Sequence, residues 1–183
     1  VSNRTMATST SIVVIGSSNT DMVIKADKFP LPGETILGGK FFMFPGGKGA
    51  NQAVTASRLG GDVTFIAKVG NDIFGKQALQ QFKKEGIHTE FVLSDPEHPS
   101  GVALITVDSK GENTIVVAQG SNSALSPEDV QRADQEFESF GIVLMQLEIP
   151  LQTVIHSARL GKSQGKKVIL NPAPAMPLPG ELF

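Results

Sequence analysis

Phe44-Pro45-Gly46-Gly47-Lys48-Gly49-Ala50-Asn51-Gln52-Ala53 decides the fold, because it joins an apolar run to a helix-forming run through three glycines. Glycine lets backbone N–H groups approach a ligand closely, and the first turn of a helix leaves N–H donors without intrahelical partners. Lys48 is followed by glycine, so the stretch is not a Walker A loop, and it lacks the dinucleotide-binding glycine spacing. At this point, a grip for a small polar ligand and a plain turn with a solvent-facing lysine both remain open.

Composition narrows the class of protein. The chain has 183 residues, 40% of them hydrophobic, with 16 basic and 18 acidic residues and no cysteine. These values favour a single globular domain with a small-molecule ligand, and they argue against a nucleic-acid surface, disulfides and thiolate chemistry. The histidines lie too far apart for a local metal motif, so we expect no metal site. No apolar run is long enough to span a bilayer, which predicts no membrane contact and a cytoplasmic location.

Strands alternate with helices along most of the chain. Expected strands lie at 12–15, 63–69, 91–93, 142–147 and 167–170. Expected helices lie at 50–59, 74–85, 126–138 and 151–162. Strands that are apolar throughout and alternate with helices predict an α/β fold with a doubly wound, mostly parallel sheet.

Four further segments do not fit that alternation, and we assign them to a separate small sheet that acts as a lid. They are 23–27, 36–44, 101–108 and 113–118, the last two forming a hairpin. Residues 12–183 are therefore expected to form one α/β domain with this lid. Residues 1–11 are expected to be a disordered or appended end.

Polar side chains gather where predicted strands end. Asn19, Thr20 and Asp21 follow the first strand, and Glu148 follows the strand at 142–147. Ligands of open parallel sheets bind beyond the carboxyl ends of the strands, so these groups and the glycine-rich turn should converge. Acids, amides, a lysine and free backbone N–H groups suit a polyhydroxylated ligand. Taken singly, Asp21 could instead be a helix or turn cap, and Glu148 a solvated residue at a strand end.

These motifs resemble those of the ribokinases, within the phosphofructokinase-B group of carbohydrate kinases. The resemblance covers the chain from about residue 12 onward, and the glycine-rich stretch is its most specific element. The matching stretches are Gly16-Ser17-Ser18-Asn19-Thr20-Asp21, Pro32-Gly33-Glu34-Thr35, Gly46-Gly47-Lys48-Gly49-Ala50-Asn51-Gln52-Ala53, Met145-Gln146-Leu147-Glu148 and Asn171-Pro172-Ala173-Pro174-Ala175.

The resemblance implies ATP-dependent phosphorylation of the 5-hydroxyl of D-ribose, giving ribose 5-phosphate, with ATP, Mg²⁺ and K⁺ as the implied cofactors. The implied sugar-binding residues are Asn19, Thr20, Asp21, Gly47, Lys48, Gly49, Ala50, Asn51 and Glu148. The lid would place Ala103, Ile105 and Ile115 over the sugar and would also form a homodimer contact. Closing such a lid excludes water, which would otherwise accept the phosphate.

The same resemblance implies a second signature, Asp-Thr-x-Gly-Ala-Gly-Asp, whose last aspartate is the catalytic base. It does not occur in the 183 residues. We therefore expect this chain to carry the sugar-binding half, to lack the base and the ATP site, and to be inactive alone. Two alternatives stay open: a kinase for another pentose or a nucleoside, and a non-catalytic sugar-binding or dimerisation module.

Overall fold

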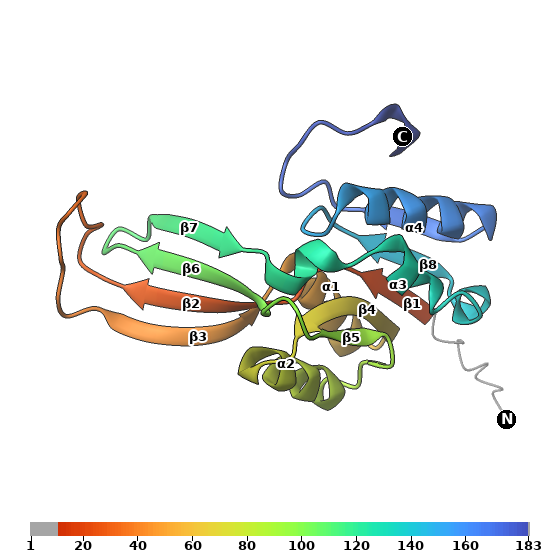
Figure 1. Ribbon diagram of the computed structural model, residues 1–183, viewed down its shortest axis with the longest axis horizontal. Helices are drawn as coiled ribbons and strands as arrows, with labels where there is room; N and C mark the ends of the chain where they lie inside the picture. The colour runs from red at the N-terminus through yellow and green to blue at the C-terminus, as the bar shows by residue number, and fades with distance from the viewer. Residues whose placement is uncertain (1–10, 183) are drawn as a thin grey trace, which may run out of the picture.

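A computed structural model of the chain describes residues 11–182. It contains two sheets that meet near the middle of the molecule (Figure 1). One sheet is covered by helices, and the other extends away from it as an arm. The expectation of a disordered or appended end falls mostly on residues outside the described range; Ser11 already belongs to the first strand.

The larger sheet has five strands in the order β5-β4-β1-β8-β9, and every neighbouring pair is parallel. Its strands are β1 (Ser11–Ile15), β4 (Asp62–Gly70), β5 (Val92–Asp95), β8 (Ile142–Met145) and β9 (Lys167–Leu170). Since β1 lies in the centre and the chain winds outward from it in both directions, the predicted doubly wound α/β fold is confirmed.

Helices cover both faces of the five-stranded sheet. They are α1 (Lys48–Arg58), α2 (Ile73–Lys84), α3 (Pro127–Gln131) and α4 (Leu151–Ser163), with 3₁₀ turns η1 (Gly120–Ala124), η2 (Glu136–Ser139) and η3 (Gly180–Leu182). Successive side chains of a strand point to opposite faces. Accordingly Val13 and Ile15 pack into the core under α3 and α4, whereas Val14 packs into the core under α1 and α2. All three are fully buried, which explains why β1 reads as a continuous apolar run.

The second sheet, which we call the small sheet, has four strands in the order β3-β2-β6-β7. These are β2 (Asn19–Lys25), β3 (Lys40–Gly46), β6 (Gly101–Val107) and β7 (Asn113–Ala118). β2 pairs antiparallel with β3 and parallel with β6, and β6 pairs antiparallel with β7. The expectation of a separate small sheet beside the parallel one is therefore confirmed.

Strand boundaries in the small sheet differ from the expected ones. β2 begins at Asn19, four residues before the expected 23–27, and β3 runs over Lys40–Gly46 in place of 36–44. Pairing explains both shifts, because the ladder between these strands extends to Asn19 opposite Gly46. The consequence is functional: polar residues expected in a loop belong to a strand.

The expected helix at 126–138 is wrong in its second half. α3 begins after Ser126, whose hydroxyl accepts the Asp129 N–H in a capping box, but the helix ends at Gln131. The chain then turns with i→i+3 backbone bonds, such as Glu136 N–H to Ala133 O. This path places Phe137 and Phe140 together in the core, so tertiary packing overrides helix propensity here.

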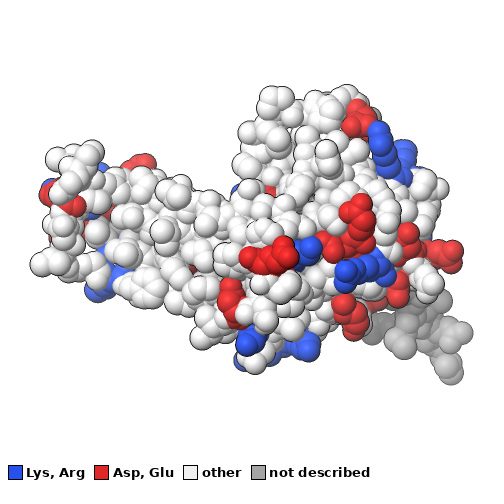
Figure 2. Space-filling view, in the orientation of Figure 1, with Lys and Arg blue, Asp and Glu red and all other residues white. Residues whose placement is uncertain are grey.

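None of the helices within residues 11–182 combines the length and apolar character needed to cross a bilayer. Charged side chains gather over the helical part of the molecule in the view of Figure 2, while the middle of the small sheet is largely uncharged. The exposed side chains there include large apolar ones, among them Phe41, Met43, Leu104 and Val116. The small sheet therefore leaves apolar surface that the chain itself does not cover.

Candidate functional site

The glycine-rich turn brings α1 into direct contact with the loop after β1. β3 ends at Gly46, Gly47 adopts φ 90°, and α1 begins at Lys48. A Cβ on Gly47 would lie 2.8 Å from the backbone nitrogen of Asn19, and one on Gly49 would lie 2.5 Å from that of Ser17. Only glycine fits both positions, because each Cβ would overlap backbone atoms and Gly47 also needs a left-handed conformation.

The first backbone N–H groups of α1 are not free, which corrects our expectation of a set of unpaired donors. The Lys48 N–H donates to Glu148 Oε2 at 2.8 Å, and the Gly49 N–H donates to Ser17 Oγ at 3.2 Å. The Ala50 N–H donates to the Ser17 carbonyl at 2.8 Å. Protein acceptors thus occupy these donors, and they hold α1 against the carboxyl ends of β1 and β8.

Glu148 lies at the N-terminus of α1, where a negative charge is favourable. Its Oε2 accepts from the Ser17 hydroxyl at 2.6 Å as well as from the Lys48 N–H. Its Oε1 lies 3.8 Å from Lys48 Nζ. The carboxylate is therefore held in one orientation through one oxygen, and the other oxygen faces the lysine ammonium.

Asp21 lies on β2, and its carboxylate packs against Gly46. A Cβ on Gly46 would lie 2.1 Å from Asp21 Oδ1, so the carboxylate occupies the space that a side chain would take there. Burial raises the pKa of the Asp21 carboxyl, and the negative charge of Glu148 raises it further. Two carboxylates from distant parts of the chain are thus close enough to interact, beside the lysine.

Asn19 is buried, with 8% of its surface exposed, and its Oδ1 accepts from Asn122 Nδ2 at 2.8 Å. Sequence reasoning missed Asn122, and it placed Ser17 in a matching motif without assigning it a role. Both offered a positional signal, since each follows a strand by a few residues, as Asn19 and Glu148 do. Asn122 belongs to none of the matching motifs, so its signal was only positional.

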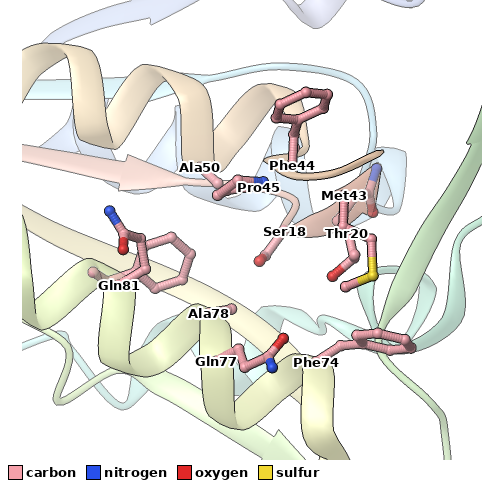
Figure 3. Close-up of a pocket in the computed structure, with 13 residues that line it drawn as sticks. Ser18, Thr20, Met43, Phe44, Pro45, Ala50, Phe74, Gln77, Ala78 and Gln81 are labelled. Carbon is pink, nitrogen blue, oxygen red and sulfur yellow. The ribbon is translucent and has the colours of Figure 1, made fainter. Parts of the chain in front are cut away.

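Two of the expected site residues face elsewhere. Thr20 lies with Met43 and Phe74 at a cavity of about 180 Å³ between the small sheet and α2, which Asn19 and Ala50 also line (Figure 3). Ala50 is 3% exposed and packs into the core under α1. The side chains that line this cavity are mostly apolar, and Asp21, Lys48 and Glu148 are not among them. The charged cluster therefore lies outside this cavity.

Asn51 lies one turn after Lys48 on α1 and is exposed. Together with Lys48, Leu144 and Asn171 it lines an open depression that runs along α1 beside the ends of β8 and β9. The structure thus places Asn51 at the same edge of the sheet as Lys48, on the solvent-facing side.

The three apolar residues expected over the ligand share one face of the small sheet with Asp21. Asp21 pairs with Ala103 across β2 and β6, and Ile105 pairs with Ile115 across β6 and β7. Paired residues project to the same face, and residues two apart on a strand do so as well. Ala103 is 4% exposed and Ile115 is 52% exposed, so this face runs from a covered base to an open end.

The arrangement offers oriented acceptors, an amide and an ammonium at the junction of two sheets. Within residues 11–182, no three histidine, aspartate or glutamate side chains gather in a way that could hold a metal ion. Asp21, Glu148, Asn19 and Lys48 offer carboxylate, amide and ammonium groups that can form hydrogen bonds with a polar ligand. Hydroxyl groups fit this set, since each can both donate to a carboxylate and accept from an amide or ammonium.

Comparison with known proteins agrees with this chemistry. Residues 9–181 match the model of the pfkB family of carbohydrate kinases. A ribokinase of Haemophilus influenzae is 44% identical over 172 residues, which cover 94% of this chain and 56% of the relative. A deoxyribokinase of Salmonella typhi is 41% identical over 165 residues, covering 90% of this chain and 54% of the relative. The chain thus spans about half the length of these curated relatives.

Solved structures give the same result. The structure of an Arabidopsis thaliana ribokinase, described as complexed with ribose and ATP, superposes with a TM-score of 0.84 at 32% identity. The match covers 95% of this chain and 57% of that one. From the extent of the family match and the agreement in fold, we conclude that this chain belongs to the pfkB family of carbohydrate kinases.

Proposed function

We propose that this chain supplies the sugar-binding part of an ATP-dependent ribokinase, which transfers the γ-phosphate of ATP to the 5-hydroxyl of D-ribose. The observation that carries the proposal is the convergence of Asp21, Glu148 and Lys48 at the junction of the two sheets. The names of the relatives in Haemophilus influenzae and Arabidopsis thaliana support the substrate.

In this proposal Asp21 accepts hydrogen bonds from ribose hydroxyls, and Asn19 donates to them from the same strand face. The sugar is bordered on the α1 side by Gly47, Lys48, Gly49 and Asn51. Glu148 completes this set of polar contacts through its Oε1. Ala50 and Thr20 support the backbone around the site, since their side chains face the core and the cavity beside α2. Phosphoryl transfer requires mainly positioning and charge stabilisation, and these residues supply positioning of the acceptor.

We further propose that the small sheet is a lid over this sugar, with Ala103, Ile105 and Ile115 on the face toward it. Its uncovered apolar side chains on the opposite face, including Phe41 and Leu104, would be buried in a homodimer. We propose ATP as the phosphate donor, with Mg²⁺ and K⁺ as further cofactors expected from the family; within residues 11–182 no group of three or more histidine, aspartate or glutamate side chains could hold a metal ion. We expect the 183-residue chain alone to bind sugar without transferring phosphate, and we expect the enzyme to act in the cytoplasm.

A substrate panel with ADP-coupled detection tests the function in the full-length protein. We expect the highest kcat/KM for D-ribose among D-ribose, 2-deoxy-D-ribose, D-fructose and adenosine. The Salmonella typhi relative makes 2-deoxy-D-ribose the second candidate. A preference for 2-deoxy-D-ribose would make the protein a deoxyribokinase within the same family. A preference for fructose or adenosine would contradict the proposed function.

Calorimetry on the 183-residue chain distinguishes the kinase half from a non-catalytic binding module. Ribose binding by this chain, combined with phosphate transfer by the full-length protein, supports the proposal. Ribose binding without phosphate transfer by the full-length protein would favour a binding module instead.

A further inference from the structure

Asn122 is a buried amide that links the point where the chain enters the small sheet to the point where the chain leaves it. It lies in η1, directly after β7 leaves that sheet, and only 1% of its surface is exposed. Its side chain contacts Ser18 and Asn19, which are 104 and 103 residues earlier in the chain, where β2 enters the sheet. A buried carboxamide at such a position must have its donors and acceptors satisfied.

The backbone determines which way the Asn122 amide faces. The Ser18 N–H donates to Asn122 Oδ1 at 2.8 Å, and a backbone N–H can only donate. Asn122 Nδ2 therefore faces the other way, toward the Ser18 carbonyl at 3.1 Å, the Gln119 carbonyl at 3.0 Å and Asn19 Oδ1 at 2.8 Å. Reversing the amide would place an oxygen against three oxygens, so one orientation is strongly favoured.

The orientation of Asn122 in turn determines that of Asn19. Because Asn122 presents a donor, Asn19 must present its oxygen to it, and Asn19 Nδ2 then faces away. Within residues 11–182, Asn19 Nδ2 donates no hydrogen bond to a protein acceptor. Asn19 thus keeps a free donor two residues from the Asp21 carboxylate, on the same face of β2.

Gly101 makes this contact possible. A Cβ at this position would lie 2.2 Å from both Asn122 Nδ2 and Asn19 Oδ1. Such distances are far inside van der Waals contact, so the two amides meet over a bare α-carbon in β6. The missing side chain at Gly101 leaves room for this pair of amides, as the missing side chain at Gly46 leaves room for the Asp21 carboxylate.

We propose that Asn122 is a positioning residue for the sugar site: it holds the Asn19 amide with its NH₂ group toward the ligand. It does not touch the sugar. Asn19 then offers a donor and Asp21 an acceptor, which is the complement of a hydroxyl pair. The inference rests on the proposed function for the identity of the ligand, but the amide orientation itself does not.

The variant Asn122→Asp tests the proposal in the full-length protein. The introduced carboxylate still accepts from the Ser18 N–H, but its second oxygen now faces Asn19 and requires that amide to reverse. An acceptor then faces the sugar beside Asp21. We expect KM for D-ribose to rise at least about tenfold, because a buried donor that the sugar needs is replaced by an acceptor, with a smaller change in kcat.

Asn113→Asp is the matched control, because it makes the same chemical change at an exposed residue of β7. We expect it to leave KM and kcat unchanged. Thermal unfolding of both variants accounts for any loss of fold. Asn122→Ser keeps a small donor and acceptor in place without adding charge, and we expect a smaller KM effect than in Asn122→Asp.

Deoxygenated sugars separate positioning from a general structural effect. The hydroxyl that contacts Asn19 is the one whose removal weakens the wild type but not Asn19→Ala. Asn122→Asp should be equally insensitive to losing that hydroxyl. If Asn122→Asp instead reduces kcat/KM by the same factor for ribose and every deoxy analogue, Asn122 is only structural and the proposal is wrong.

NMR of the side-chain amides gives a readout that needs no sugar. In the wild type we expect slow hydrogen exchange at Asn122 Nδ2 and fast exchange at Asn19 Nδ2, and in Asn122→Asp slow exchange at Asn19 Nδ2. Unchanged exchange at Asn19 would overturn the proposal. If the exchange pattern inverts but the wild type phosphorylates no sugar, the proposed function fails while the positioning role of Asn122 stands.

Discussion

The five-stranded sheet and the small sheet differ in how much of their apolar surface the chain itself covers. In the five-stranded sheet, Val13, Val14 and Phe65 are fully buried between helices on both faces. In the small sheet, Phe41 and Phe42 lie on opposite faces and are 58% and 37% exposed. Helices of the chain itself cover the centre of the first sheet, whereas the second sheet exposes large apolar side chains on both faces.

The largest expected contrast is in stability. Phe65 packs edge-on against Phe82 with 5.1 Å between ring centroids, and we expect Phe65→Ala to cost about 3–5 kcal/mol. Phe41→Ala should change the free energy of unfolding by no more than about 0.5 kcal/mol, because the side chain is exposed. Denaturant unfolding at several protein concentrations measures both.

If the loss of stability in Phe41→Ala depends on protein concentration, a second copy of the chain covers the small sheet. If Phe41→Ala lowers the free energy of unfolding as much as Phe65→Ala does at every protein concentration, the contrast between the two sheets is wrong. The apolar surface of the small sheet would then be covered within one chain.

The next largest effect concerns the acceptor at the base of the small sheet. Asp21→Asn keeps the shape but removes the charge, and we expect kcat/KM for D-ribose to fall about a hundredfold in the full-length protein. Asp108→Asn, the same change in the β6–β7 turn, should leave the kinetics unchanged. Equal kinetics for Asp21→Asn and the wild type would contradict the assignment of Asp21.

A smaller effect is expected from filling the space beneath that carboxylate. Gly46→Ala places a Cβ at 2.1 Å from Asp21 Oδ1, so the carboxylate must move, and we expect KM for D-ribose to rise about tenfold. Gly180→Ala is the control, since no atom lies within 4 Å of its Cβ position. Unchanged KM in Gly46→Ala would mean that the exact position of Asp21 does not matter.

The smallest expected effect is the contribution of the Asp21 charge to the stability of the fold, for which we predict only the direction. Burial and Glu148 raise the pKa of Asp21, so the folded state holds this proton to higher pH than the unfolded state does. Stability from Asp21 therefore decreases as pH rises from the ordinary value of 3.8 through the raised pKa. At neutral pH, Asp21→Asn should unfold at a slightly higher temperature than the wild type. A lower Tm would show that the Asp21 charge stabilises the fold.

The pattern of residues predicted the five-stranded sheet well, because its signals are local. Val13, Val14 and Ile15 form a run that only a strand buried on both faces explains, and the glycines at 46, 47 and 49 correctly mark the turn into α1. The break after Gln131 could not be predicted. It depends on where Phe137 and Phe140 find space in the core, which is a property of the whole fold.

The site was predictable in part, for a similar reason. Asp21 and Glu148 could be brought together by the rule that ligands bind beyond the ends of parallel strands. The occupation of the α1 N–H groups by Ser17 and Glu148, and the contact between Asn19 and Asn122, join segments about 30 to 130 residues apart. No local pattern encodes such contacts, so the residues that orient the site could not be identified from sequence.

The most direct test of the central claim is a crystal structure of the full-length protein with D-ribose. We predict ribose at the junction of the two sheets, with its hydroxyls at hydrogen-bond distance from the Asp21 carboxylate and Asn19 Nδ2. Ribose bound in the cavity beside Phe74, or away from both sheets, would contradict the account.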